Sequence, residues 1–234
     1  MSKRDFDDFD DFARDYRQIH NKAIRISGTD SDYFSEQKIG EVRTNEVGDD
    51  PHILDLGCGD GNSASFFHKY FPDAEYCGLD VSEESVAVAQ ERAIPNATFS
   101  KYNGIDIPFS DNTFDIVFVS CVMHHISFDM HESFLKEARR VMKNGGRVYI
   151  FEHNPFNPMT QRIVRACPFD ADAVLMTSFY TKKLLSKLDF GAIKIDYTLF
   201  FPRFSIFRKI LRLEKYLKWL PLGGQYYARS IKIG

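Results

Sequence analysis

Residues 52–62 read His-Ile-Leu-Asp-Leu-Gly-Cys-Gly-Asp-Gly-Asn, and residues 63–70 continue as Ser-Ala-Ser-Phe-Phe-His-Lys-Tyr. The apolar run at the start predicts a buried strand, and the second stretch has the spacing of a helix. Between them, glycines at positions 57, 59 and 61 allow a sharp turn. Glycine also has no Cβ atom to hold a ligand away from the main chain. The stretch therefore predicts a ligand-binding turn between a strand and a helix.

The residue that follows the third glycine separates two kinds of ligand. A dinucleotide-binding turn has glycine or alanine in this place, where the helix must pack closely over a pyrophosphate. Asn62 stands there instead. The order Asp-Leu-Gly-Cys-Gly-Asp-Gly resembles the first motif of class I S-adenosylmethionine-dependent methyltransferases, whose cofactor has no phosphate. The resemblance implies that the cofactor is S-adenosylmethionine and that it contacts Asp55, Gly57, Cys58 and Gly59.

The second predicted strand, residues 74–80, ends on a carboxylate. Asp80 is followed by Val81 and then by Ser82, a good N-cap for the next helix. An acid at the end of the second strand of such a unit accepts hydrogen bonds from the ribose hydroxyls of an adenosine. We assign Asp80 and its neighbour Val81 to the cofactor. The alternative is an acid that only favours the positive end of the following helix.

A third block, residues 97–109, continues the resemblance. Asn103 and Gly104 precede Ile-Pro-Phe at 107–109, similar to the acidic residue and Leu-Pro-Phe turn of ubiquinone/menaquinone-type methyltransferases. Asn103 stands where that family usually has Asp toward the adenine amino group, and its amide oxygen can still accept that hydrogen bond. The resemblance gives Gly104 a backbone N–H donor role toward the adenine ring.

The fourth predicted strand, residues 116–120, is uniformly apolar until Ser120, as expected for a strand covered on both faces. The turn that follows, Cys-Val-Met-His-His at 121–125, resembles the family's Leu-His-His turn. The resemblance places Ser120 and Cys121 beside the methionine part of the cofactor, and we expect His124 near the acceptor. Adjacent side chains usually point apart, and no Cys or carboxylate cluster accompanies the two histidines, so we predict no metal site.

These features occur in the family's order, and a fifth strand is expected at 147–151. Together they predict an α/β, Rossmann-like, seven-stranded, mostly parallel sheet with helices on both faces. A C-terminal antiparallel pair of strands is expected at 190–197 and 226–233. The resemblance is closest over residues 50–155.

The segment after the fifth strand reads Glu-His-Asn-Pro-Phe-Asn-Pro at 152–158. Ligands of open α/β sheets bind outside the carboxyl ends of the strands. We therefore expect Glu152 and His153 to face the acceptor, one of them as the base for a hydroxyl, with Asn154 beside them. The alternative for His153 is a histidine bonded only to backbone. Residues 161–172 are expected to form the far wall.

Residues 1–50 are expected to form a helical cap over a methyltransferase domain at 51–234. Phe6, Phe9, Phe12 and Tyr16 recur at helical spacing, in a segment that runs on to His20. Such a stripe usually serves packing. The family, however, commonly uses this region as a lid. The candidate lid or substrate residues are Tyr16, His20 and Tyr33, with Phe34 and Lys38.

Charge is divided unevenly along a chain of net charge −3. Residues 181–234 contain twelve Lys and Arg but three Asp and Glu. Residues 204–220 predict a cationic amphipathic helix. It either packs its apolar face on the domain or contacts an anionic membrane that carries a lipid-linked substrate. The acidic whole and the lack of a nucleic-acid-binding module argue against a nucleic-acid partner.

Length and cysteine usage complete the expectations. The 234 residues suffice for one domain with a cap, and four scattered cysteines with no apolar signal core favour a cytoplasmic location. We expect methyl transfer to a small molecule, with a sugar or lipid-linked hydroxyl favoured and a quinone-like ring as the alternative. A nicotinamide-dependent oxidoreductase and a non-catalytic adaptor remain as readings from other classes.

Overall fold

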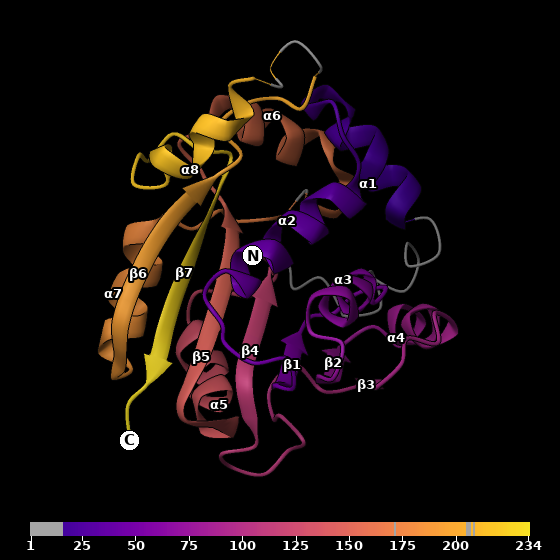
Figure 1. Ribbon diagram of the computed structural model, residues 1–234, viewed down its shortest axis with the longest axis vertical. Coiled ribbons are helices and arrows are strands. Elements are labelled where there is room, and N and C mark those ends of the chain that lie inside the picture. The colour runs from indigo at the N-terminus through magenta and orange to yellow at the C-terminus, as the bar shows by residue number, and fades with distance from the viewer. Residues whose placement is uncertain (1–15, 171, 205–206, 208) are drawn as a thin grey trace.

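The computed structural model describes residues 16–170, 172–204, 207 and 209–234, and in this part of the chain seven strands form one sheet (Figure 1). Their order is β3-β2-β1-β4-β5-β7-β6. The first five are parallel, and β7 runs antiparallel between β5 and β6. The strands are β1 (His52–Leu56), β2 (Glu75–Asp80), β3 (Ala97–Lys101), β4 (Phe114–Ser120), β5 (Met142–His153), β6 (Phe190–Thr198) and β7 (Gln225–Lys232). The predicted fold class is confirmed.

Helices cover both faces of the sheet. One face carries α2 (Ser31–Arg43), α3 (Asn62–Tyr70) and α4 (Glu83–Glu91), and the other carries α5 (His131–Val141) and α7 (Ser178–Lys187). Because side chains alternate along a strand, Ile53 packs in the cluster that contains α2 and α3, whereas Leu54 packs in the cluster that contains α5. This double covering explains why the central strands are continuously apolar.

The carboxyl ends of the parallel strands lie under a second group of helices. Figure 1 shows α1 (Tyr16–Ile24), α2 and α6 (Pro158–Ala166) at this end of the sheet. Asn157 begins α6 by accepting the Thr160 N–H at 3.0 Å. Phe6, Phe9 and Phe12 of the predicted cap lie outside the described residues. The order of the strands reverses between β1 and β4, which is where ligands bind in open α/β sheets.

The prediction of one helix over 204–220 is wrong. The described residues there form a short 3-10 turn, Leu211–Leu213, followed by α8 (Glu214–Leu217). The reason is long-range bonding, because the Glu214 carboxylate accepts the N–H groups of Phe200 and Phe201 at 2.9 and 3.0 Å. Its other oxygen pairs with Arg203 at 2.7 Å. These contacts tie the segment to the preceding loop and interrupt a continuous helix.

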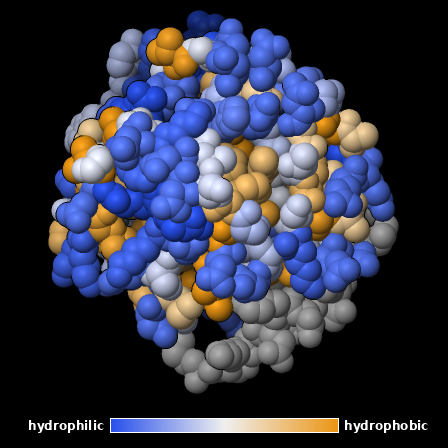
Figure 2. Space-filling view, turned by 90° about the horizontal axis from the view of Figure 1, so that it is seen from below, coloured by the Kyte–Doolittle hydropathy of each residue, from blue (hydrophilic) through white to orange (hydrophobic). Residues whose placement is uncertain are grey.

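The surface is mostly hydrophilic at the amino ends of the parallel strands, as Figure 2 shows. None of the helices in the described ranges has the length and apolar character needed to cross a membrane.

Three exposed apolar side chains, Phe156, Trp219 and Leu222, lie in two neighbouring loops. Asn157 joins these loops by donating to the Leu222 carbonyl at 2.9 Å. We call these three residues the apolar rim.

Candidate active site

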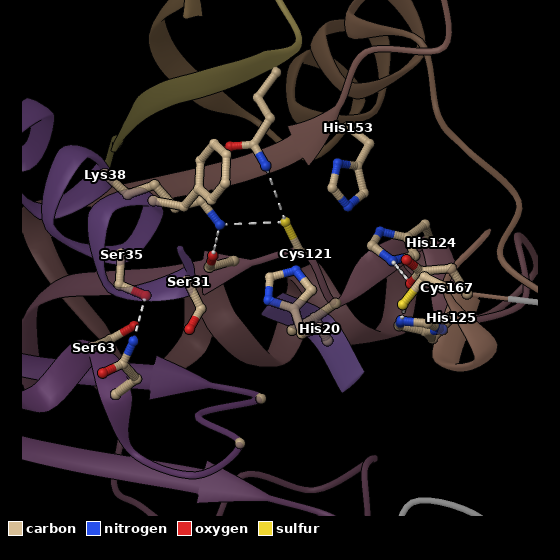
Figure 3. Close-up of a pocket in the computed structure, with 18 of the residues that line it drawn as sticks. His20, Ser31, Ser35, Lys38, Ser63, Cys121, His124, His125, His153 and Cys167 are labelled. Atoms are coloured by element: carbon tan, nitrogen blue, oxygen red, sulfur yellow. Dashed lines mark hydrogen bonds and ion pairs between the residues drawn. The ribbon is translucent and has the colours of Figure 1, made fainter. Parts of the chain in front are cut away.

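A cavity of 790 Å³ lies between the carboxyl ends of β1, β2, β4 and β5 and the helices α1, α2 and α6. Its volume is within the range of about 300–1,000 Å³ that is typical of small-molecule sites. Figure 3 shows side chains from the N-terminal helices and from the strand ends pointing into it. The cavity is therefore the candidate site for the cofactor and the acceptor.

The glycine turn forms one end of this cavity. A Cβ atom on Gly57 would lie 2.3 Å from Val122 Cγ2, whereas nothing lies within 4 Å of the position where a Cβ atom on Gly59 would stand. The Gly59 backbone has φ +53° and donates its N–H to Asp80 Oδ2 at 2.8 Å. The turn is thus fixed on one side and open on the other, which leaves main chain free to contact a ligand.

Asp80 is held in the position that a ribose-binding carboxylate requires. Its Oδ2 accepts the Gly59 N–H, and its Oδ1 accepts the Ser82 N–H at 3.0 Å. A carboxylate oxygen can accept more than one hydrogen bond, as contact with the hydroxyls of a nucleoside requires. Asp80 lines the cavity together with the predicted cofactor residues Cys58, Val81 and Gly104.

Asp55 is fully buried at the bottom of the cavity. Burial raises its pKa to about 7, although Tyr76 donates to Oδ2 at 2.6 Å. The other oxygen, Oδ1, is buried and has no hydrogen-bond partner among the described residues. A buried carboxylate oxygen without a donor suits a cationic ligand group, such as the amino group of a methionine moiety. These residues fit S-adenosylmethionine.

The role predicted for Asn103 is wrong. This side chain is exposed and does not line the cavity. Its Oδ1 accepts the N–H groups of Ile105 and Asp106 at 2.9 and 2.8 Å, and its Nδ2 donates to the Asp106 carboxylate. Asn is a frequent turn residue because it satisfies its own neighbouring backbone in this way. Tyr102 and Ile105 line the cavity at this point instead.

A polar group faces the cavity where β4 ends. Lys38 Nζ donates to Ser120 Oγ at 2.8 Å and lies 3.4 Å from Cys121 Sγ (Figure 3). Burial opposes ionisation of the Cys121 thiol, but Lys38 and His153 outweigh it and lower the pKa to about 6. Cys121 also has φ +58°, a strained value for a residue other than glycine. Sequence reasoning placed Cys121 beside the cofactor but found no signal for an activated thiol.

His153 and His20 both line the cavity near this group. Burial, followed by the charge of Lys38, lowers the pKa of His20 to about 4, so its imidazole is neutral at pH 7. The predictions for Glu152 and Asn154 are wrong, because neither side chain lines the cavity. Both are buried on the opposite side of the chain from His153, as strand alternation requires at the end of β5.

Those two buried side chains hold neighbouring segments in place. Glu152 Oε1 accepts the Met123 N–H at 2.9 Å, and Oε2 is 2.6 Å from His124 Nδ1. Asn154 donates to the carbonyls of Gly223 and Pro221 at 2.7 and 3.2 Å. They support the cavity wall from behind.

His124 and His125 come together with Asp170, contrary to the prediction that they diverge without a carboxylate nearby. Their ring centroids are 4.2 Å apart. Burial lowers the pKa of His124, but Glu152 and Asp170 outweigh it and raise the value to about 10. Burial and the neighbouring His124 lower the pKa of His125 to about 3. All three residues line the cavity.

Only some of the predicted lid residues line the cavity. His20, Phe34 and Lys38 line the cavity, whereas Tyr33 does not, and its ring lies under the Arg203 guanidinium at 5.0 Å. Tyr16 is the first residue of α1, and its side chain is outside the described part. Arg17 was not predicted, yet its Nε is 2.5 Å from Asp60 Oδ2 in the glycine turn.

Comparison with known proteins agrees with this geometry. The family model described as a methyltransferase domain matches residues 53–146. An uncharacterized methyltransferase of Bacillus subtilis is 32% identical over 128 residues, which cover 53% of this chain and 49% of that protein. A demethylmenaquinone methyltransferase of Chlorobaculum parvum is 33% identical over 115 residues, covering 49% and 46%. The chain thus spans about half the length of these curated relatives.

A solved structure supports the fold over a longer range. The crystal structure of an S-adenosylmethionine-dependent methyltransferase from Archaeoglobus fulgidus superposes with a TM-score of 0.68 and covers 87% of this chain and 95% of that one. Identity is 17%, so this likeness concerns the fold alone. Together, these findings show that the chain contains a methyltransferase domain at residues 53–146 and shares its fold with an S-adenosylmethionine-dependent methyltransferase.

Proposed function

We propose that the protein transfers the methyl group of S-adenosylmethionine to a hydroxyl on a largely apolar small-molecule acceptor. The observation that carries this proposal is the continuity of one cavity from Asp80 and Asp55 to His153 and Lys38. Cofactor and acceptor can therefore occupy the same cavity. S-adenosylmethionine supplies the methyl group, and the electrons of the broken C–S bond stay on sulfur.

The acceptor end of the cavity favours an apolar molecule. Many of its lining side chains are aliphatic or aromatic, among them Phe34, Ile126, Met159, Ile163 and Phe200. A free sugar would leave its hydroxyls without partners on such walls, at a cost of about 1–3 kcal/mol for each one. A lipid-linked hydroxyl, or a phenol, would bury its apolar part and present one polar group.

His153 is the group that would accept the proton of that hydroxyl. It lines the cavity, and its ring centroid is 5.3 Å from that of His124. The remaining task of the protein is positioning, since a bound pair of reactants in a water-excluding site gains most of its rate from orientation. A quinone-like ring is the second candidate, because a relative named above is a demethylmenaquinone methyltransferase.

A lipid-linked acceptor would have to reach the protein from a membrane, and we propose that the apolar rim meets it there. Trp219 and Leu222 are 74% and 60% exposed, and Lys215 lies in the preceding helical turn. Aromatic and basic side chains in combination are typical of contacts with an anionic bilayer surface.

The proposal is tested by measuring first cofactor binding and then methyl transfer. Calorimetry with S-adenosylhomocysteine should show one site, and Asp80→Asn should weaken it at least about tenfold through loss of charged acceptors. Binding of NADH in place of S-adenosylhomocysteine would instead favour an oxidoreductase, and binding without any transfer would favour an adaptor.

Transfer itself is measured with labelled S-adenosylmethionine and three acceptors: a long-chain lipid alcohol, a hydroquinone and a free sugar. We expect the lipid alcohol to react best. His153→Ala should lower kcat by about 10²–10⁴-fold and leave S-adenosylhomocysteine affinity unchanged. His52→Gln, at the amino end of β1 and outside the cavity, is the matched control.

A further inference from the structure

We propose that His124, His125 and Asp170 form a binding site for one divalent transition-metal ion at the acceptor end of the cavity. The Nε2 atoms of the two histidines and Oδ1 of Asp170 lie within 4.8 Å of one another. Two imidazole nitrogens and a carboxylate oxygen are donors that suit Zn²⁺, Co²⁺ or Fe²⁺ better than Mg²⁺ or Ca²⁺.

The spacing of the donor atoms agrees with a shared ion. Ligands about 2.1 Å from a tetrahedral metal are roughly 3.4 Å from one another. Asp170 Oδ1 is 3.5 Å from His124 Nε2 and 3.6 Å from His125 Nε2. Both separations are close to that ligand–ligand spacing and longer than the distances of ordinary hydrogen bonds.

The surroundings of His124 give independent support. Its side chain is 1% exposed, and its Nε2 has no hydrogen-bond partner among the described residues. Its other ring nitrogen, Nδ1, is 2.6 Å from the buried Glu152 carboxylate. Metal-binding histidines almost always donate their second nitrogen to such a partner, which fixes the ring and leaves the other nitrogen for the metal.

The position of the site suggests its use. The three ligands line the same cavity as His153, so an ion there would keep coordination positions open toward the acceptor. An acceptor hydroxyl bound at such a position would lose its proton more easily, and His153, whose ring centroid is 5.3 Å from that of His124, would receive it. This role rests on the proposed function, whereas the binding of metal does not.

The experiment measures metal binding directly on the full chain after treatment with a chelator. Titration with Co²⁺, followed by visible absorption, and with Zn²⁺, followed by calorimetry, should show one ion per chain. Asp170→Asn and His125→Gln should each weaken both by about 10–100-fold or more, since each removes a direct ligand. Mg²⁺ should bind at least tenfold more weakly than Zn²⁺.

Two controls keep the result decisive. His52→Gln removes a histidine outside the cavity and should leave Co²⁺ and Zn²⁺ affinity unchanged. S-adenosylhomocysteine binding to Asp170→Asn shows whether that variant is folded, and His125→Gln serves if it is not. Absence of a stoichiometric Co²⁺ spectrum, or equal affinity in wild type and both ligand variants, overturns the proposal even if methyl transfer is observed. In that case the cluster is a hydrogen-bonded network without metal.

Discussion

At the scale of single residues, the cavity is lined by one buried acid and one thiol whose ionisation differs from that in water. Asp55 loses its proton only near pH 7, because burial disfavours its charged form. Cys121 is the reverse case, because nearby positive charge favours its thiolate. Each shift leads to a measurement that does not require the acceptor to be known.

Asp55 should make cofactor binding depend on pH. If its ionised carboxylate binds the amino group of the cofactor, affinity for S-adenosylhomocysteine should rise as pH increases through about 7. The gain should approach tenfold per pH unit below that value and then level off. Calorimetry between pH 5.5 and 8.5 measures it. Asp55→Asn should bind more weakly and lose this slope, and a slope that persists in the variant would assign it to another group.

The same raised pKa bears on stability with the opposite sign. A carboxyl whose folded pKa exceeds its unfolded value favours the folded state at low pH, and this contribution is lost as pH rises through about 7. Asp55 therefore costs stability at pH 8 unless a cation is bound. Asp55→Asn should raise the melting temperature of the ligand-free protein more at pH 8 than at pH 5, because the cost grows between the ordinary carboxyl pKa of 3.8 and about 7.

Cys121 should react with iodoacetamide at a pH where ordinary thiols do not. Its thiolate should persist down to about pH 6, so the alkylation rate should fall around that pH instead of near 8.5. Lys38→Met should move this midpoint upward, because Lys38 Nζ lies 3.4 Å from the sulfur. Peptide mass spectrometry separates Cys121 from Cys77, whose pKa is raised by burial. Equal midpoints in wild type and Lys38→Met would contradict the assignment.

At the scale of elements, the turn between β1 and α3 sets the position of the cofactor. Gly57 combines φ +80° with a Cβ position 2.3 Å from Val122, so Gly57→Ala should lower the free energy of unfolding by about 1–3 kcal/mol. Gly40→Ala is a control in α2, where a Cβ meets nothing within 4 Å. It should stabilise the protein by about 0.5–1 kcal/mol. Urea unfolding compares the two, and an unchanged or higher stability of Gly57→Ala would show that the turn tolerates a side chain.

The helices α1 and α2, which we predicted to form a lid, are bound to that turn by polar contacts. Arg17 pairs with Asp60 at 2.5 Å, and Asn62 Nδ2 donates to Ser35 Oγ in α2 at 2.9 Å. Arg17→Ala should loosen α1 and speed cofactor dissociation, since the Asp60 partner is only 10% exposed. Stopped-flow displacement of S-adenosylhomocysteine measures this rate. Arg43→Ala, an arginine of α2 that pairs with exposed Asp49, should leave it unchanged.

At the scale of the whole molecule, the apolar rim is a feature of the surface, so its proposed contact with a membrane can be tested separately from the cavity. The wild-type protein should sediment with anionic vesicles. The double variant Trp219→Ser/Leu222→Ser should lower the bound fraction several-fold. Phe179→Ser, on α7, removes a side chain that is equally exposed at 75% and should have no effect. Equal binding to neutral and anionic vesicles would show that the basic residues do not contribute to membrane binding.

The sequence by itself determined which segments form the strands, the glycine turn and the place of Asp80. These features rest on neighbouring residues, since a turn needs its glycines in succession and a strand its apolar run. The late strands were predicted for the same reason, and they are β6 and β7. The N-cap role of Ser82 is likewise a local feature, because its Oγ accepts the Ser85 N–H at 3.0 Å.

Only the tertiary structure decided which side chains enter the cavity. Glu152 and His153 are neighbours, yet strand alternation buries one and opens the other to the cavity. Asn103 turns to its own backbone, and Glu214 binds a distant loop that interrupts the expected helix. Asp170 joins His124 from 46 residues along the chain. Such groupings depend on contacts between distant segments, which no local pattern of residues contains.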